Sequence, residues 1–295
     1  MRPATLSQNT GFAVRFYSAT RVIHWRNWIV MVLLAVGAVF MLLPFLWTFS
    51  TSLRPVAEAY RLPPSFFPDQ FDVSSYGKLK DGPIPFLPMY WNSFLVAAIT
   101  TIGVVFTSAM AAFAFSRLRF PGSNILFASM LIGLMVPPAL VLIPLFFGLA
   151  ALGLIDTLWS LILPALANPL AILMMREFMR SQPREYEESA FVDGASYWTI
   201  FWRISLPQMG PPIAALSIIV FTTSWNNFLL PLVFIRSFDV MTLPVGILSL
   251  FGSYGAEELS VILAAVALSI LPLLLVFLIA QRFIVESIAS TGVKK

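Results

Sequence analysis

The segment 185–207 reads EYEESAFVDGASYWTIFWRISLP and differs from the rest of the chain in its polarity. The chain has 295 residues, of which 59% are hydrophobic and 11% are charged, whereas about a quarter of the residues in a soluble domain are charged. Within this apolar chain, the segment still places Glu185, Glu187, Glu188 and Asp193 close together. The composition predicts a membrane protein, and the acidic segment is expected to be a specialised connection outside the lipid.

Six apolar stretches are each long enough to cross a membrane as a helix, since about 20 apolar residues span the hydrocarbon core. We expect these spans near residues 28–49, 91–115, 124–147, 157–175, 208–235 and 259–280. The first stretch is longer than the apolar part of a signal peptide and has no small-residue cleavage site, so it is expected to remain as an anchor. The sequence therefore predicts an all-α, polytopic membrane protein with six transmembrane helices.

The basic residues predict the orientation of these spans, because Lys and Arg concentrate in cytoplasmic loops. Most of the 18 basic residues lie in the two terminal segments and in the second-to-third and fourth-to-fifth connections. Both termini are therefore expected in the cytoplasm. The expected parts are a cytoplasmic N-terminal segment 1–27, a transmembrane domain 28–283 with an external loop 50–90 and a cytoplasmic loop 179–207, and a cytoplasmic tail 284–295.

The residues that the chain lacks exclude several functions. It has no Cys and a single His, His24, so thiol chemistry is excluded and no metal site is expected. The six spans contain no ionisable residue, whereas ion-driven carriers place such groups in the membrane. Protease motifs and a P-loop are also missing, and the scattered basic residues do not indicate nucleic-acid binding. The chain is not expected to be an enzyme, and energy for uphill transport would have to come from another protein.

Neutral polar residues gather in the fifth span, in the stretch FTTSWNNFLLPLVF at 221–234. Uncharged amides, hydroxyls and an aromatic face suit a sugar, so we hypothesise a substrate pathway that includes Thr223, Trp225, Asn226 and Asn227. The alternative is that the two asparagines hold helices together. That second interpretation is the prediction for the isolated Asn92 and Asn168.

The local pattern of the acidic segment predicts two short helices. Pro183 suits the first helical position, the three glutamates complement the helix dipole, and Gly194 can end the helix in the left-handed conformation. The second helix is expected to be capped by Ser196. Its apolar positions recur at helical spacing, at Tyr197, Ile200, Phe201 and Ile204, beside a second row of Trp198 and Trp202. Small residues at Ser189 and Ala190 would let another protein come close, so the segment is predicted to be a docking element. The alternative is an ordinary amphipathic hairpin at the membrane surface.

These motifs resemble those of a known family. Glu188-Ser189-Ala190, Asp193-Gly194-Ala195 and Ile204-Ser205-Leu206-Pro207 look like the EAA motif of ABC-importer permeases, with Ser189 where Ala is usual. The run from Pro183 to Pro207 is similar to the carbohydrate-uptake, maltose-type class. The stretches AAFAFSRLRFPG at 111–122 and WNNFLLPLVF at 225–234, and the tail Gly292-Val293-Lys294, resemble the same family. The length of the external loop is similar to that of the smaller, second permease subunit.

The resemblance implies a type I permease fold in a prokaryotic inner membrane, and a division of labour. A second homologous permease, two ATPase subunits that bind ATP and Mg, and an extracytoplasmic solute-binding protein are implied, besides membrane lipid. Residues implied to couple to the ATPase are Glu185, Glu187, Glu188, Ser189, Ala190, Asp193, Gly194 and Ala195. In maltose-type systems the larger permease makes most of the substrate contacts.

The implied function is import of sugars or oligosaccharides by alternating access. The same machinery also carries glycerol phosphates, polyols or acidic sugar oligomers. Two other hypotheses stay open, a facilitator that works alone and a membrane scaffold without transport. A facilitator would leave the acidic segment unexplained.

Overall fold

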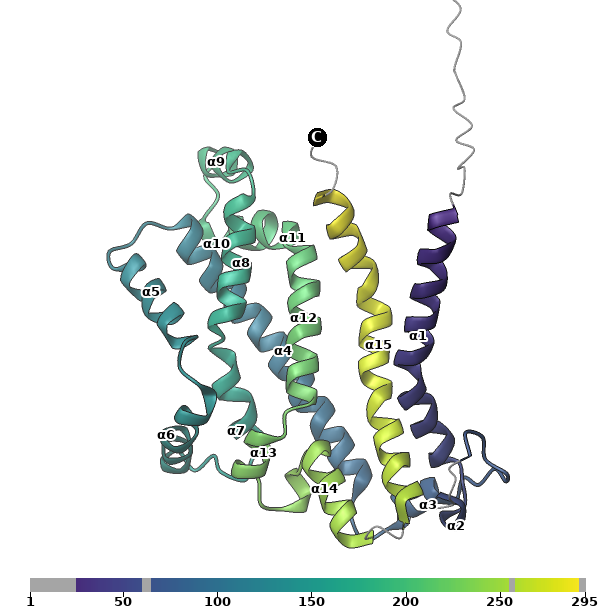
Figure 1. Cartoon of the computed structure of the whole chain (residues 1–295). Helices are drawn as coiled ribbons and strands as arrows, with labels where there is room; N and C mark the ends of the chain where they lie inside the picture. The colour runs from purple at the N-terminus through teal and green to yellow at the C-terminus, as the bar shows by residue number, and fades with distance from the viewer. Residues whose placement is uncertain (1–24, 60–64, 255–257, 292–295) are drawn as a thin grey trace, which may run out of the picture. The chain divides into compact units, whose positions relative to one another are not determined.

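The computed structural model describes residues 25–59, 65–254 and 258–291, and every regular element in these ranges is a helix (Figure 1). The tail motif at Gly292 to Lys294 lies outside the described residues. In chain order the helices are α1 Trp25–Ser52, α2 Val56–Ala59, α3 Ser74–Asp81, α4 Phe86–Arg117, α5 Ser123–Gly133, α6 Pro138–Ala151, α7 Trp159–Ile162, η1 Leu163–Leu166, α8 Pro169–Ser181, α9 Glu185–Val192, α10 Tyr197–Ile200, η2 Phe201–Ser205, α11 Leu206–Gln208, α12 Gly210–Trp225, α13 Leu229–Phe234, η3 Phe238–Val240, α14 Leu243–Tyr254 and α15 Leu259–Thr291.

The chain divides into two units, Met1–Leu46 and Trp47–Lys295. The described part of the first unit is the N-terminal portion of α1, which is apolar from Trp28 onward. The second unit holds all the other helices, and the packing and the sites described below lie within it.

Helix α4 is the central element of the second unit and packs along both α8 and α12. Small residues on α4, such as Ala97, Ala109 and Ala112, are fully buried, and they let neighbouring helices approach closely. Two buried apolar clusters follow α4. One surrounds its N-terminal half with α14 and α15, and the other surrounds its C-terminal half with α8, η2 and α12. The C-terminal half of α4 is therefore connected through packed side chains to the acidic segment.

Within the described residues, four stretches are long and apolar enough to cross a membrane as single helices, and two bent helix pairs raise the number to six if each pair counts as one span. The span expected over 124–147 is one of these pairs. It breaks between α5 and α6, whose axes differ by 107°. The cause is Pro137-Pro138, because a residue before proline avoids the α region, and Pro137 adopts ψ 130°.

The spans expected over 157–175 and 208–235 are also interrupted. The first is divided between η1 and α8 at Asn168-Pro169 and continues to Ser181, and the second is divided between α12 and α13 at 226–228. A broken helix frees backbone carbonyls that lipid cannot satisfy. One of them, Leu166 O, accepts a hydrogen bond of 2.8 Å from Thr107 Oγ1 on α4. The interruption before α8 therefore lies where α4 supplies a polar partner.

The connections contain more helix than the sequence predicted. The external loop expected over 50–90 holds α2, α3 and the first residues of α4, and the connection 236–258 contains the apolar helix α14. Both stretches are rich in Gly, Pro and Ser, which are typical of loops, so their short helices were not predicted. Arg54 in the first of them is buried, and its Nη2 donates to Ser50 Oγ at 3.0 Å and to Ser65 O at 2.6 Å.

Asp156 joins the turn after α6 to the segment after α13. Its Oδ1 accepts hydrogen bonds from the backbone N–H groups of Ser237 (2.9 Å) and Arg236 (2.8 Å) and from Ser237 Oγ (3.1 Å). The backbone N–H groups of Ser237 and Arg236 hold the pKa of Asp156 below its usual value. Asp156 also adopts a φ of 61°, which Asp and Asn tolerate better than other side chains with a Cβ.

We expect Asp156→Asn to lower the melting temperature by about 2 °C at pH 7, because the amide keeps the backbone conformation and loses only the charge. A carboxylate with a lowered native pKa stabilises the fold above its unfolded pKa of about 3.9, and this contribution is lost as the pH falls through the native pKa. The difference between variant and wild type in a thermal melt in detergent should therefore disappear in acid. A difference of constant size from pH 7 to pH 3 would contradict this expectation.

Candidate functional site

The first part of the acidic segment forms helix α9. This helix lies at the end of the second unit opposite α3 and α14 (Figure 1). The sequence predicted a helix that ends before Gly194, and in the structure α9 runs from Glu185 to Val192 with Asp193 as its C-cap. Pro183 was expected in the first helical position. It instead precedes the N-cap residue Arg184, so its fixed φ orders the entry to α9 rather than its first turn.

The predicted end of α9 at Gly194 is confirmed. Gly194 has a φ of 84°, its N–H donates to Phe191 O at 3.1 Å, and the next N–H, of Ala195, donates to Ala190 O at 2.9 Å. This is the Schellman arrangement, which satisfies the free carbonyls of the last turn. The predicted cap at Ser196 is also confirmed, since its Oγ accepts from Thr199 N at 3.2 Å.

We expect Gly194→Ala to loosen this junction, because a Cβ costs about 1–2 kcal/mol in the left-handed conformation. Amide exchange at Gly194 and Ala195 should then be about tenfold faster in hydrogen–deuterium exchange of the peptide that contains them. Gly194→Asn should show a smaller effect, because Asn tolerates this conformation. Gly148→Ala is the control, since Gly148 lies within α6 with open space around its Cβ position. Unchanged exchange in the alanine variant would contradict the expectation.

The second predicted helix is present but irregular. It begins as α10, continues as the π-helix η2 and ends as α11. The Leu206 N–H reaches back five residues to Phe201 O, and the following Pro207 has no N–H to donate. Ile200 and Phe201 are buried, whereas Tyr197, Trp198 and Trp202 are exposed.

Glu187 connects α9 to two other elements. Its Oε2 lies 2.6 Å from Arg117 Nε at the C-terminal end of α4, and its Oε1 accepts from Ser205 Oγ of η2 at 2.9 Å. The side chains of Arg117 and Glu187 are only 5% and 12% exposed. Two further bonds hold the same junction, from Arg184 Nη2 to Ser116 O at 2.9 Å and from Arg117 Nη2 to Gln182 O at 3.3 Å. Polar contacts therefore join α9 and its N-terminal flank to α4 and to η2.

Sequence reasoning placed Glu187 in the coupling segment but missed its two partners. Arg117 belongs to the stretch 111–122, and Ser205 to the motif that ends the segment. Both were noted only because their stretches resemble the family, and no contact between them and Glu187 was predicted. Ser189 and Ala190 were predicted as small residues that let another protein come close, but Ala190 packs against the buried cluster around the C-terminal half of α4, as does Ala195. Ser189 keeps its hydroxyl on its own helix, donating to Glu185 O at 2.8 Å.

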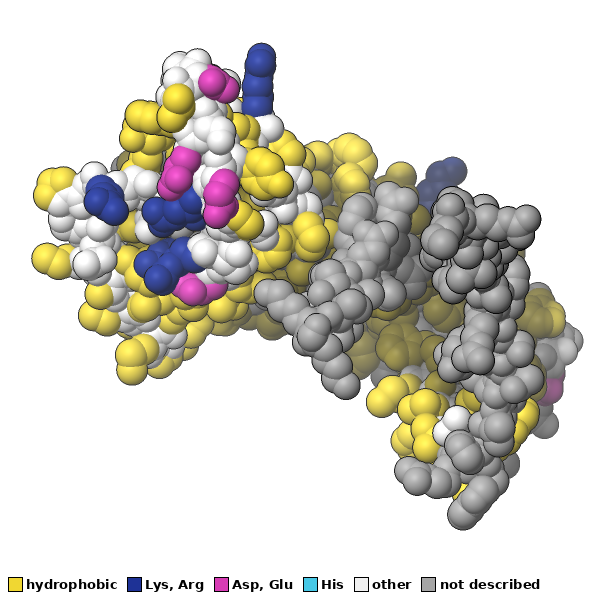
Figure 2. Space-filling model, turned by 90° about the horizontal axis from the view of Figure 1, so that it is seen from above, with side chains coloured by type: hydrophobic (Ala, Val, Ile, Leu, Met, Phe, Trp, Pro, Cys, Tyr) yellow, Lys and Arg dark blue, Asp and Glu magenta, His cyan; other side chains and the backbone are white. Residues whose placement is uncertain are grey.

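The outer surface of α9 is apolar and acidic. Tyr186, Phe191 and Val192 are exposed, Val192 by 86%, and Glu188 and Asp193 are also exposed. Figure 2 shows this end of the second unit, where hydrophobic, acidic and basic side chains lie close together. Beside α9 is a pocket of about 320 Å³ lined by Phe113, Arg117, Arg184, Glu187, Glu188, Phe191, Val192, Tyr197 and Ile200. An exposed apolar surface with a polar rim is typical of a protein contact site.

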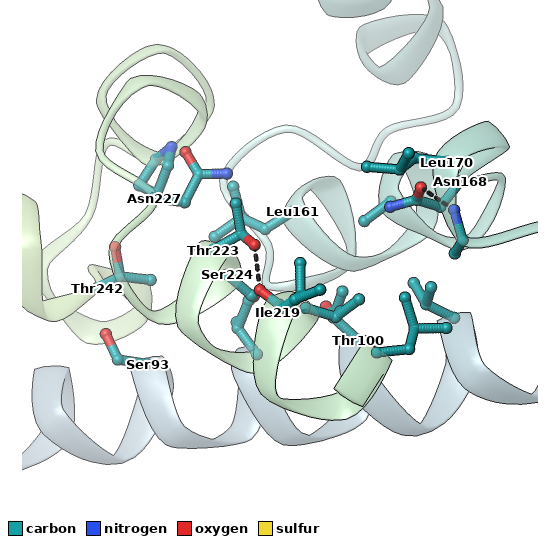
Figure 3. Close-up of a pocket in the computed structure, with 17 residues that line it drawn as sticks. Ser93, Thr100, Leu161, Asn168, Leu170, Ile219, Thr223, Ser224, Asn227 and Thr242 are labelled. Carbon is teal, nitrogen blue, oxygen red and sulfur yellow. Dashed lines mark hydrogen bonds between the residues drawn. The ribbon is translucent and has the colours of Figure 1, made fainter. Parts of the chain in front are cut away.

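A second pocket, of about 290 Å³, lies between α4, α12, α13 and the start of α8 (Figure 3). Two of the predicted substrate-pathway residues, Thr223 and Asn227, line it. Its other lining residues are Ser93, Val96, Thr100, Val104, Leu161, Ala165, Asn168, Leu170, Ala171, Leu216, Ile219, Val220, Ser224, Pro231 and Thr242. The described lining has no charged and no aromatic side chain.

The other two predicted pathway residues are not brought to this pocket. Trp225 is 2% exposed, lies in the apolar core between Phe221 and Tyr90, and donates from Nε1 to Ser269 O at 3.1 Å. Asn226 is exposed and donates from Nδ2 to Thr222 O at 2.9 Å. Trp225 follows Thr223 by two residues on α12, and consecutive helical residues are about 100° apart around the axis, so the two side chains point in different directions.

The two isolated asparagines have different roles. Asn92 donates from Nδ2 to Asp239 O at 2.8 Å and to Met241 O at 3.1 Å, which confirms that it connects α4 to another element. Asn168 instead caps α8, where its Oδ1 accepts from Ala171 N at 3.0 Å. Within the described residues, no group of three His, Cys, Asp or Glu side chains is placed to hold a metal ion.

Comparisons with known proteins identify the family of this chain. The family described as "binding-protein-dependent transport system inner membrane component" matches residues 103–290. The chain is 33% identical over 269 residues to the arabinooligosaccharides transport system permease protein AraQ of Bacillus subtilis (strain 168), covering 88% of this chain and 95% of that protein. It is 36% identical over 270 residues to the trehalose transport system permease protein SugB of Mycobacterium tuberculosis (strain CDC 1551 / Oshkosh), covering 90% and 97%.

Among solved structures, the fold matches a chain of a bacterial ABC transporter involved in the import of the acidic polysaccharide alginate. The TM-score is 0.78 at 24% identity, covering 89% of this chain and 98% of that chain. The match shows a shared fold. With the family match over most of its length and relatives above 30% identity along nearly all of it, the chain belongs to the binding-protein-dependent transport system inner membrane component family of membrane permeases.

Proposed function

We propose that this chain is a permease subunit of an ATP-driven importer for sugars or oligosaccharides. Relatives that match nearly its whole length carry the names of arabinooligosaccharide and trehalose transport systems. Six transmembrane spans with both termini in the cytoplasm form the proposed topology. In it the bent pair of α5 and α6 is one span, and α12, which a 77° bend separates from the helical segment Tyr197–Gln208, belongs to another. The chain would form half of a translocation path together with a second, homologous permease.

The contact of Glu187 with Arg117 and Ser205 is the observation that carries the coupling proposal. In this proposal the exposed surface of α9 docks in an ATPase subunit, and Glu185, Glu188 and Asp193 supply polar anchors at its rim. Closure of the ATPase pair moves α9. The ion pair transmits this movement to α4, and Ser205 transmits it through η2 to α12, which lines the polar pocket.

The remaining chemistry is assigned to partners. Two ATPase subunits bind ATP and Mg and hydrolyse the nucleotide, and this chain contributes no ATPase site and no cofactor. A solute-binding protein delivers the substrate on the outer side, where the proposed topology places α2, α3 and the turn held by Asp156. Alternating access then follows from the movement of α9 that ATP binding drives.

The test is co-purification of the tagged chain in mild detergent, followed by uptake of labelled sugar into proteoliposomes. The wild type should bring down an ATPase and one second permease, and uptake should require ATP. Val192→Asp on the exposed face of α9 should lose the ATPase. Val73→Asp, at a similarly exposed valine before α3, is the control and should keep it. A chain that purifies alone and still transports sugar would contradict the proposal and favour a lone facilitator.

A further inference from the structure

Two buried hydroxyls in the polar pocket have no hydrogen-bond partner among the described residues. Thr100 on α4 is 2% exposed and Thr242 before α14 is 3% exposed, and Oγ1 of each is unpaired. Threonines in helices commonly donate to a preceding carbonyl, as the neighbouring Thr101 does to Ala97 O at 2.6 Å. An unpaired buried hydroxyl destabilises the fold because it has given up its hydrogen bonds to water without replacing them. A ligand or water in the pocket is therefore needed to satisfy them.

In the part of the chain that the structure describes, two side-chain amides at the same pocket, those of Asn168 and Asn227, make hydrogen bonds with their oxygen atoms only. Asn168 Oδ1 accepts from Ala171 N, and Asn227 Oδ1 accepts from Leu230 N at 3.2 Å. Each oxygen thus caps the start of a helix, and in the described structure neither Nδ2 donates to another residue. Ser93 Oγ accepts from Leu243 N at 2.7 Å, which leaves its proton available. In Figure 3, Ser93 and Thr100 lie along α4, facing Thr223 and Ser224 on α12.

These groups form an uncharged surface that is part polar and part apolar. Amide donors and hydroxyls, which both donate and accept, alternate with apolar side chains such as Val96, Leu161 and Val220. A sugar ring has the matching character, with hydroxyls at its edge and C–H groups on its faces. The lining carries no cation to compensate a carboxylate or phosphate, and an uncompensated buried charge is costly. The pocket thus favours an uncharged ligand that is rich in hydroxyls.

The size and position of the pocket fit a site on a transport path. Its volume of about 290 Å³ is at the lower end of small-molecule pockets, roughly 300–1,000 Å³, and suits one ring rather than an oligomer. Two interrupted helices meet there, at Asn168 before α8 and at 226–228 after α12, and transporters place substrate sites at such interruptions. The absence of an aromatic face in the lining favours weak binding, which a path requires for release.

From these observations we infer that Thr100, Thr242, Asn168 and Asn227 form a subsite on this chain for a single neutral sugar ring. The inference rests on the proposed import function and adds to it that this chain contacts substrate itself. It also sets a preference for neutral over acidic sugars at this point of the path.

The first experiment uses the assembled importer in proteoliposomes, with labelled trehalose and arabinobiose as neutral probes and digalacturonate as the acidic probe. The double variant Thr100→Val and Thr242→Val keeps the shape of both side chains and removes both hydroxyls. It should raise the apparent KM for the transported neutral sugar about tenfold. Ser108→Ala is the control, because Ser108 Oγ on α4 is also buried and unpaired but lies outside the pocket; it should leave KM unchanged.

The second experiment uses the natural absence of cysteine from the chain. Thr242→Cys creates a single thiol at the pocket, and a saturating neutral sugar should slow its labelling by N-ethylmaleimide at least threefold. Digalacturonate should not protect it. Because this readout needs no ATP hydrolysis, it also reports on binding in a variant that transports poorly.

The outcomes separate the subsite from the proposed function. Wild-type uptake with an unchanged KM in the valine variant and no protection of the thiol would overturn the subsite alone, and would mean that the pocket holds only water. Stronger protection by digalacturonate would overturn the preference for neutral sugars. If the wild-type complex takes up none of the three sugars with ATP but the thiol is protected by a neutral one, the subsite stands and sugar import by this route fails.

Discussion

Replacing Glu187 by alanine is expected to reduce ATP-dependent uptake at least tenfold. The change removes the carboxylate that pairs with Arg117 at 2.6 Å and accepts from Ser205. Arg117 is then left buried without its counter-charge, and breaking a buried pair from one side costs about 3–5 kcal/mol. Since the pair is also the direct link from α9 to α4, ATP hydrolysis should continue at its basal rate without stimulation by the substrate-loaded binding protein.

A double-mutant cycle separates this link from a general loss of stability. Arg117→Ala alone should be nearly as harmful as Glu187→Ala, and the two together should be less harmful than the sum, because the double variant leaves no unpaired charge. Uptake, stimulated ATP hydrolysis and the thermal melt are measured for each protein. Additive losses of stimulated hydrolysis in the cycle would mean that the two residues act separately.

Glu177→Ala is the matched control for this cycle. Glu177 lies 2.7 Å from Arg176 Nη1, but its side chain is 54% exposed, and surface ion pairs contribute only about 0–1 kcal/mol. Uptake should therefore stay close to that of the wild type. A loss equal to that of Glu187→Ala would show that any charge change at this end of the second unit disturbs coupling.

Trp225→Ala is expected to lower the free energy of unfolding by about 3 kcal/mol. The indole is buried between Phe221 and Tyr90 and donates to Ser269 O, so its removal leaves a cavity and a lost bond between α12 and α15. We take the lower end of the range for aromatic truncations because lipid supplies little hydrophobic driving force between helices. A thermal melt in detergent should shift down by several degrees.

Two further variants show that the effect arises from packing rather than from substrate contact. Trp225→Phe keeps most of the ring volume and loses the N–H, so about 1 kcal/mol is expected. Trp159→Ala removes an exposed indole at the start of α7 and should change stability little. In Trp225→Phe the apparent KM for sugar should stay at the wild-type value. A raised KM at unchanged stability would return Trp225 to the substrate path, where the sequence first placed it.

Local chemistry made much of the functional segment predictable. The left-handed turn needs Gly194, the cap needs a side chain such as Ser196, and three glutamates favour the first turn of α9, so all three features follow from neighbouring residues. The breaks within the spans were only partly predictable. Proline and asparagine indicated where helices are weak, but the 107° bend between α5 and α6 depends on what each half packs against.

The sequence by itself determined the helical, membrane-spanning character of the chain, the position of α9 and the neutral composition of its spans, because hydrophobicity, charge and capping act over a few residues. Only the tertiary structure decided that Glu187 meets Arg117, that Trp225 belongs to the core, and that Thr100 joins Thr242 at one pocket. These contacts connect residues far apart along the chain. They depend on how α4 packs between its neighbours, and helix rotation and packing are cooperative properties of the whole fold that no local pattern specifies.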